Sequence, residues 1–322
     1  MKYGLPIEID LPEGFLEKEV RCGYEVPSEM KKVWAIQLDV LNQVLKCCNR
    51  HQIDVWMAGG SLLGAVRHKG YIPWDDDVDV MMSRKDFRLF CKFACKELPK
   101  DLFLQTQYTE PCYIGYFARV RKLGTAQISL SEAKNSSTHN MGIAVDVFPL
   151  DVFSTSKVPF AFRVSTVVEN LRQVAHKPAR KFYSERHTFL GKLRRILCLV
   201  LRLRFVNHIL TWANEFLFSR YGDRKDWPYF LCPAWWNHFT KGSADCSRWI
   251  YPQDWFSKTI LLPFEFLKVP VPQKFEEILS VTYGDWRKFD RGSACHKDVI
   301  FECNKDYKVV LMERFGYTRS DF

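Results

Sequence analysis

A glycine turn and an acidic run lie close together between residues 58 and 82, and both are suited to phosphate chemistry. The turn is Gly59-Gly60-Ser61, and the acidic run covers residues 75–80 (DDDVDV). Small residues in the turn allow backbone N–H groups to approach a phosphate, and a following helix would add a favourable dipole. Crowded carboxylates repel one another unless a cation lies between them, and their hard oxygen atoms suit Mg²⁺ or Mn²⁺. The two features in this order indicate phosphoryl or nucleotidyl transfer.

The acidic run alternates with valine, which predicts a strand over residues 77–82. On such a strand the side chains of Asp75, Asp77 and Asp79 would point to one face, and we predict all three as metal ligands. A solvated acidic loop would not need this alternation. A calcium loop is a poor alternative because no glycine stands at the required position and no glutamate closes the loop.

A further carboxylate, Asp146, lies inside the apolar stretch 143–148 (IAVDVF), which is typical of a buried strand. Burying an unpaired charge is unfavourable, so Asp146 requires a cationic partner. That partner is either a basic side chain, in a salt bridge, or a metal ion shared with Asp77 and Asp79. We favour the shared metal and predict Asp77, Asp79 and Asp146 as the catalytic carboxylates.

Basic residues near these motifs are candidates for binding the phosphates of a donor. Arg67, His68 and Lys69 follow the glycine turn, and Arg119 lies on the predicted strand 113–122. The alternative to phosphate binding is that His68 simply ends a helix and that Arg119 lies at a solvated edge of the sheet. We predict that the turn residues Gly59, Gly60 and Ser61 and these four basic residues contact the donor.

Residues 59–68 (GGSLLGAVRH) and 72–80 (IPWDDDVDV) resemble the signature of the LicD family, which includes the fukutin-related proteins and belongs to the nucleotidyltransferase-fold superfamily. The resemblance extends more weakly to 145–151 (VDVFPLD) and 283–285 (YGD). The middle of the chain, from about residue 155 to about residue 255, shows no resemblance to the family. It implies that Asp146 supplies the third metal ligand. It also implies transfer of a phospho-substituent, such as phosphocholine, from a CDP-linked donor to a hydroxyl of a cell-surface glycan such as lipopolysaccharide, or to its lipid-linked precursor.

Two other classes of function remain open at this stage. One is a nucleotidyltransferase that uses a nucleoside triphosphate on a small acceptor. The other is a glycan- or membrane-binding protein with a decayed site, although the intact acidic set argues against it.

Supporting elements are expected around the motifs. A helix is predicted from Ser28 to about Arg50, a strand over 54–58, a helix from Ser83 to Leu98, and strands over 102–108 and 113–122. The fold class expected with the resemblance is α+β, with a nucleotidyltransferase-like mixed sheet flanked by helices and a largely helical C-terminal region. We expect an irregular lead-in over 1–27, a catalytic core over 28–155, and a mainly helical, aromatic-rich region over 156–322.

Composition limits the partners and the location. The net charge is +10 and the sequence pI is near 9.0, which favours anionic partners, but no nucleic-acid-binding motif is present. Eleven cysteines without a regular spacing, no signal peptide and no long apolar run predict a cytoplasmic protein. A basic amphipathic helix over 192–204 could contact an anionic membrane. A zinc site is possible in principle but less favoured, because its candidate ligands include no C-x-x-C pair. These candidates are Cys232, Cys246, Cys295, His296 and Cys303.

Overall fold

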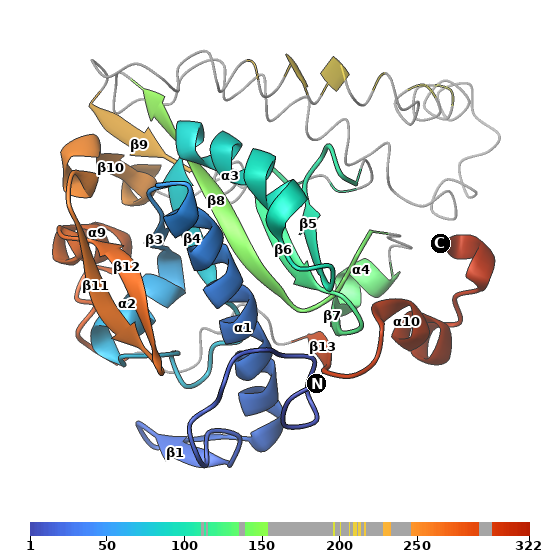
Figure 1. Cartoon of the computed structure of the whole chain (residues 1–322). Coiled ribbons are helices and arrows are strands. Elements are labelled where there is room, and N and C mark those ends of the chain that lie inside the picture. The colour runs from blue at the N-terminus through green and yellow to red at the C-terminus, as the bar shows by residue number, and fades with distance from the viewer. Residues whose placement is uncertain are drawn as a thin grey trace, which may run out of the picture.

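The structure is a computed structural model, and it describes residues 1–110, 113, 115–134, 139–153, 228–232, 246–289 and 298–322, with positions 196, 200, 206, 209, 210, 212, 213 and 216. Helices and a mixed sheet share one core, so the predicted α+β class is confirmed (Figure 1).

The central sheet is built around one long strand, β8 (Ala144–Phe153). The strand order is β10-β9-β8-β4-β3, and β6 pairs with β8 while β5 pairs with β6. Only the β4–β8 pair is parallel among these described strands. The remaining bounds are β3 (Trp56–Met57), β4 (Asp79–Ser83), β5 (Leu102–Gln105), β6 (Ala118–Lys122), β9 (Tyr229–Leu231) and β10 (Ile250–Pro252).

Helices α1 (Ser28–Arg50) and α3 (Arg84–Glu97) cover one face of this sheet (Figure 1). Apolar residues at helical spacing on α1, among them Trp34, Val40 and Val44, are fully buried and join the main core. At the start of α3, the Ser83 hydroxyl accepts a hydrogen bond from the Asp86 amide and so caps the helix. Helix α2 (Gly59–Arg67) lies between β3 and β4 in the chain.

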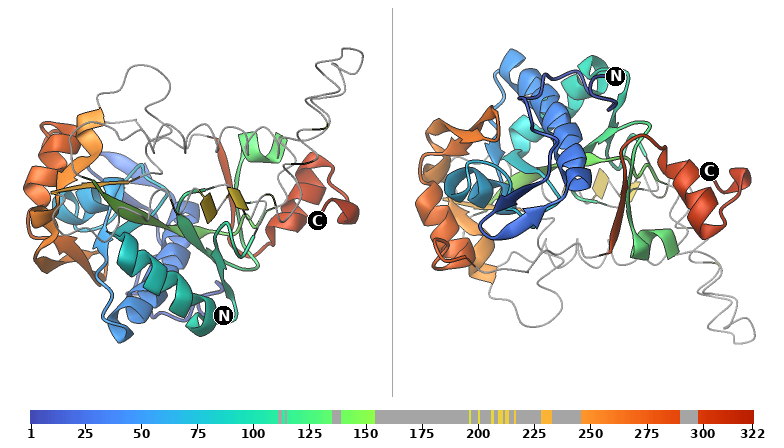
Figure 2. Two further views of the ribbon diagram at one scale, coloured as in Figure 1. Left: turned by 90° about the horizontal axis from the view of Figure 1, so that it is seen from above. Right: turned by 90° about the horizontal axis from the view of Figure 1, so that it is seen from below.

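The described C-terminal part contains more strand than expected. Strands β11 (Thr259–Phe264) and β12 (Leu267–Pro272) form an antiparallel hairpin. Strand β13 (Val299–Glu302) pairs with β7 (Ala126–Ser129). The hairpin lies at one end of the molecule and α10 at the other (Figure 2). The other elements are β1 (Glu19–Arg21), β2 (Tyr24–Val26), α4 (Leu130–Lys134), α9 (Phe275–Tyr283), α10 (Tyr307–Phe315), and 3₁₀ turns at Cys246–Trp249, Gln253–Phe256 and Arg319–Asp321.

Several predictions fall on residues that the structure does not describe. Most of the basic helix predicted over 192–204 is outside the described residues, although Ile196 and Val200 are helical and exposed. Cys295 and His296 are also outside them, so the zinc reading stays untested. In the described part of the chain, no helix combines the length and apolar character needed to cross a membrane.

Candidate active site

Two of the predicted carboxylates lie side by side in the middle of the sheet. Asp79 is the first residue of β4 and pairs in register with Asp146 of β8, and Asp146 pairs in turn with Arg119 of β6. Residues paired across neighbouring strands point to the same face. Lys122, which faces the other way on β6, forms an ion pair with Asp39 of α1. The three side chains therefore occupy the face of the sheet that α1 leaves uncovered.

The strand predicted over residues 77–82 is present as β4 but begins two residues later, so Asp79 lies on it while Asp75 and Asp77 precede it. Side chains of α1 hold this acidic loop: Trp34 Nε1 donates to the Asp75 carbonyl at 3.1 Å, and Gln37 Nε2 donates to the Asp76 carbonyl at 2.7 Å. Since these carbonyls are bonded to a helix, the backbone leaves the sheet ladder. The carboxylates of Asp75 and Asp77 therefore do not follow the alternation of a strand.

The folded loop brings a residue into the site that the sequence reasoning missed. One carboxylate oxygen from each of Asp75, Asp76 and Asp77 lies within 4.8 Å of the others. Such a cluster suits a hard divalent cation. Asp76 was missed because a strand would have turned its side chain to the opposite face.

Asp79 shows how strongly these carboxylates repel one another. Burial raises the pKa of Asp79 well above its ordinary value, and the charges of Asp77, Asp146 and Asp75 raise it further, while Arg119 opposes them only weakly. A buried acid surrounded by other acids favours its protonated form unless a cation is bound nearby. The loop and the two strands therefore act as one electrostatic unit.

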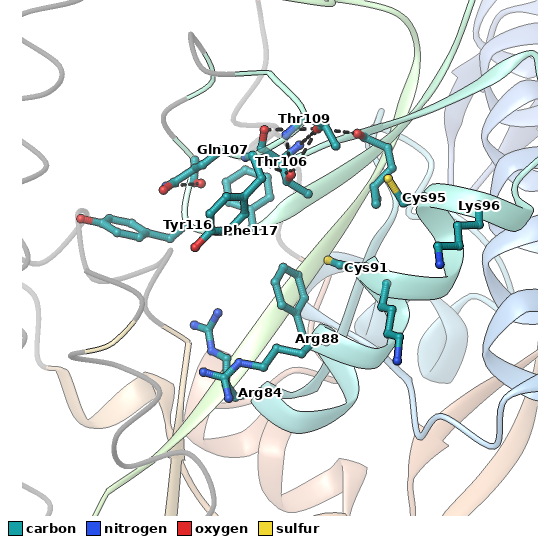
Figure 3. A pocket seen from close by; sticks show the side chains of 15 residues that line it. Arg84, Arg88, Cys91, Cys95, Lys96, Thr106, Gln107, Thr109, Tyr116 and Phe117 are labelled. Carbon is teal, nitrogen blue, oxygen red and sulfur yellow. Dashed lines mark hydrogen bonds between the residues drawn. The ribbon is translucent and has the colours of Figure 1, made fainter. Parts of the chain in front are cut away.

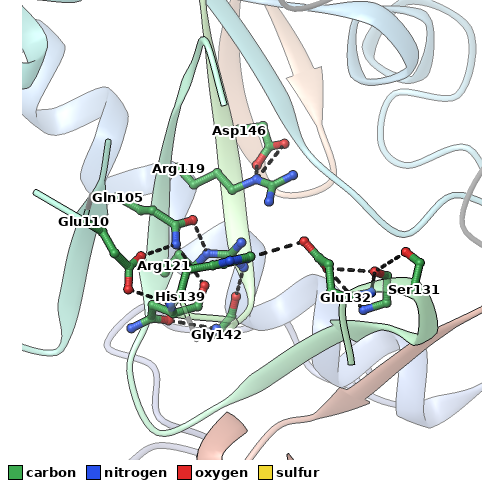
Figure 4. Close-up of polar contacts among 11 residues, drawn as sticks. Gln105, Glu110, Arg119, Arg121, Ser131, Glu132, His139, Gly142 and Asp146 are labelled. Atoms are coloured by element: carbon green, nitrogen blue, oxygen red, sulfur yellow. Dashed lines mark hydrogen bonds and ion pairs between the residues drawn. The ribbon is translucent and has the colours of Figure 1, made fainter. Parts of the chain in front are cut away.

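Arg119 is the cationic side chain closest to this unit in the described structure. Its Nε donates to both oxygens of Asp146, at 3.0 Å and 3.2 Å (Figure 4). Burial alone would lower the pKa of Arg119, but the Asp146 carboxylate offsets this and keeps the pKa raised. The salt bridge considered from the sequence is therefore present, and it lies beside the carboxylates that a shared metal would use.

The glycine turn lies against the acidic loop because it lacks side chains. Helix α2 begins at Gly59, whose φ is +50°. A Cβ added at Gly60 would lie 2.7 Å from Asp75 Oδ2, and one added at Gly59 would lie 3.5 Å from Asp79 Oδ2. The amide N–H groups of the first helical turn have no partner within their own helix, so they can bind an anion. Ser61 is buried, and its hydroxyl accepts from the Asp79 amide at 2.9 Å, which fixes α2 to β4.

The basic triplet lies at the other end of α2, about 12 Å along the helix from the turn. Arg67 donates to the carbonyls of Trp286 and Lys288, at 2.7 Å and 2.9 Å. Burial, followed by the neighbouring Arg67 charge, lowers the pKa of His68 to about 4. The Lys69 carbonyl accepts from the Glu265 amide. The structure thus gives the triplet contacts to C-terminal segments, and donor binding by these residues stays a prediction.

Tyr283 is a residue of this site that the sequence matched only weakly. A Cβ on Gly59 would lie 3.9 Å from its hydroxyl. Burial raises the pKa of Tyr283, and Tyr251 and the carboxylates of Asp75 and Asp79 raise it further. The tyrosine ends α9, so the C-terminal region contributes a side chain to the site.

The carboxylates and the glycine turn lie together beside one sheet, an arrangement suited to phosphate chemistry. Residues 52–149 match the family described as LicD/FKTN/FKRP, nucleotidyltransferase domain. This match covers both motifs that carry the resemblance to the LicD family and supports that resemblance.

Curated relatives agree with this resemblance. The chain is 24% identical to the lipopolysaccharide cholinephosphotransferase LicD of Haemophilus influenzae over 259 residues, which are 78% of this chain and 88% of the relative. Shorter matches join it to two uncharacterized proteins: RT0683 of Rickettsia typhi, 39% identical over 18% of both chains, and RP689 of Rickettsia prowazekii, 49% identical over 12% of this chain and 14% of the relative. The family and the long match support a transferase.

Proposed function

We propose that the protein is a Mg²⁺- or Mn²⁺-dependent transferase that moves a phosphocholine-like group from a CDP-linked donor to a hydroxyl of a glycan or its lipid-linked precursor. The observation that carries the proposal is the in-register pair Asp79–Asp146 beside the acidic loop and the start of α2. The similarity to a lipopolysaccharide cholinephosphotransferase supports the choice of donor group and acceptor class.

The residues present fit a divalent cation. Asp79 is partly buried among Asp75, Asp77 and Asp146, and the charges of these neighbours raise its pKa, which a bound cation would oppose. Carboxylate oxygens are the ligands that Mg²⁺ and Mn²⁺ prefer. Asp75, Asp77, Asp79 and Asp146 would hold the ion, which would stabilise negative charge on the transferring phosphate and on the leaving group.

Other groups of the site orient the donor and the acceptor. The first turn of α2 offers N–H donors to a diphosphate. Within the described part of the chain, Arg119 contacts Asp146 through Nε, so its Nη groups can bind a phosphate oxygen. Asp146 also has the chemistry to accept the proton of an attacking hydroxyl.

The test is a panel of CDP-linked donors incubated with the purified protein, Mg²⁺ and a glycan acceptor, with release of CMP as the readout. CDP-choline should give CMP and transfer to the acceptor. Asp79→Asn and Asp146→Asn should lower the rate by about a hundredfold or more, because each removes a charge that positions the cation. Asp54→Asn, at an exposed position in the same domain, is the matched control and should keep the wild-type rate.

A parallel reaction with CTP or ATP in place of the CDP-linked donor distinguishes the proposal from its main alternative. Pyrophosphate release there, with no CMP from any CDP-linked donor, would replace the proposal by a nucleotidyltransferase. Unchanged glycan modification in cells that carry the Asp79→Asn protein would instead favour a binding protein.

A further inference from the structure

A cavity of about 440 Å³ lies between α3 and the segment that joins β5 to β6 (Figure 3). None of the carboxylates of the candidate active site lines it. Its volume is in the range of pockets that hold small ligands. The cavity is therefore a separate feature from the acidic cluster and needs its own explanation.

The inside of the cavity is mainly apolar. Phe87 and Leu104 line it and are less than a tenth exposed, and Phe117 closes one side. Phe117 packs on Phe148 with ring centroids 4.6 Å apart, so this wall is fixed by the sheet. A hydrocarbon chain gains free energy by leaving water for such a surface, whereas a bare sugar phosphate would find few partners inside.

One wall of the cavity carries a row of basic residues. Arg84, Arg88, Lys92 and Lys96 follow one another at four-residue intervals along α3, so they form one flank of the helix. Arg84 is neutralised by a two-point ion pair with the buried Asp151, at 2.8 Å and 2.6 Å. Lys92 and Lys96 are exposed at the cavity, and with Arg88 they give this wall a positive potential.

We propose that this cavity binds one hydrocarbon chain of an anionic amphiphile, with the phosphate group of the ligand at the row formed by Arg88, Lys92 and Lys96. An apolar interior beside a cationic wall complements both parts of such a molecule. The ligand is a membrane phospholipid or a lipid-linked phosphate, which share this chemistry. The inference does not depend on the transfer reaction, although Phe117 also lies 4.9 Å below the guanidinium of Arg119 and so joins the cavity to the active site.

Two cysteines make occupancy measurable in the intact protein. Cys91 and Cys95 line the cavity, and Cys22 is an exposed cysteine elsewhere; none of the three is in a disulfide. The rate of maleimide labelling of each cysteine is measured by peptide mass spectrometry. The probe ligand is dodecyl phosphate, used below its critical micelle concentration. At ten times its dissociation constant the probe should slow labelling of Cys91 and Cys95 about tenfold, because about one cavity in ten stays empty. Cys22 should be unaffected.

Control ligands and variants decide between the proposal and simple apolar adsorption. Inorganic phosphate and dodecyl maltoside at the same concentration should protect neither thiol. The double variant Lys92→Glu with Lys96→Glu should weaken dodecyl phosphate binding by about tenfold or more, since it replaces attraction by repulsion. Lys18→Glu with Lys268→Glu has the same charge change on exposed residues elsewhere and should bind normally. Equal protection by the maltoside, no protection by dodecyl phosphate, or unchanged binding by the Lys92/Lys96 variant would each overturn the proposal.

Sedimentation with vesicles identifies the source of the ligand. If phosphatidylglycerol vesicles sediment the wild type but not the Lys92/Lys96 variant, the proposal is supported and the ligand is a membrane phospholipid. If dodecyl phosphate binds while neither protein sediments, the proposal is supported and the ligand is a lipid-linked phosphate. Circular dichroism and the Tm of each variant verify the fold. The readouts contain no CDP-linked donor, so failure of transfer and failure of binding are separate results.

Discussion

Replacing Asp79 by asparagine should make the metal-free protein more stable while removing its response to the metal. The carboxylate is partly buried beside Asp77 and Asp146, which repel its charge. Asparagine is of similar size and removes that repulsion. We expect the free energy of unfolding to increase by about 1–2 kcal/mol, as for other substitutions that relieve a strained functional site, and the Tm to rise by about 2–5 °C.

The pH dependence of this gain follows from the sign of the shift. The pKa of Asp79 in the folded protein is raised above 3.8, so at lower pH the residue is protonated in both states and the two proteins should be equally stable. As the pH rises from there through the raised pKa, the wild type loses stability relative to Asp79→Asn. Above that pKa the difference should be constant.

Added metal should reverse the order. At a hundred times its dissociation constant, Mn²⁺ stabilises a protein with one site by about 2.7 kcal/mol, and this gain should be seen for the wild type alone. Thermal unfolding in EDTA and in Mn²⁺, over a series of pH values, is the assay. Asp151→Asn is the contrasting variant, because Asp151 is also a buried aspartate of β8 but is paired with Arg84. It should destabilise the protein by about 3 kcal/mol or more in either buffer. The reasoning is refuted if Asp79→Asn destabilises the metal-free protein, or if Mn²⁺ stabilises it as much as the wild type.

Three further substitutions probe how the site is held. Gln37→Leu removes the hydrogen bond to the acidic loop and should lower Mn²⁺ affinity by about tenfold or more in a calorimetric titration, whereas Gln43→Leu on the exposed side of the same helix should bind Mn²⁺ normally. Gly60→Ala places a Cβ 2.7 Å from Asp75 Oδ2 and should displace the loop, so Mn²⁺ affinity should fall while far-UV circular dichroism is retained; unchanged affinity would show that the close approach is unimportant. Arg119→Lys keeps the charge but loses the planar fork, so the KM for the CDP-linked donor should rise by about tenfold or more, and an unchanged KM would remove Arg119 from donor binding.

The sequence alone predicted the chemistry. Carboxylates at this density, a glycine turn before them and one aspartate inside an apolar strand predict a cation and a phosphate from composition and spacing. The α+β class and the resemblance to the LicD family followed from patterns within about 100 residues of each other. These signals are local, because a turn, a strand and a run of like charges are each defined by neighbouring residues.

The tertiary structure decided how the groups meet. The β4–β8 register places Asp79 beside Asp146, 67 positions further along the chain, and α1 draws Asp75 and Asp76 out of the expected strand through Trp34 and Gln37. In the sequence these two α1 residues are indistinguishable from ordinary core positions of an amphipathic helix. The Arg119 ion pair and the cavity beside α3 likewise depend on strand pairing and helix packing. Contacts between distant segments depend on how whole elements pack, so the spacing of residues along one element cannot predict them.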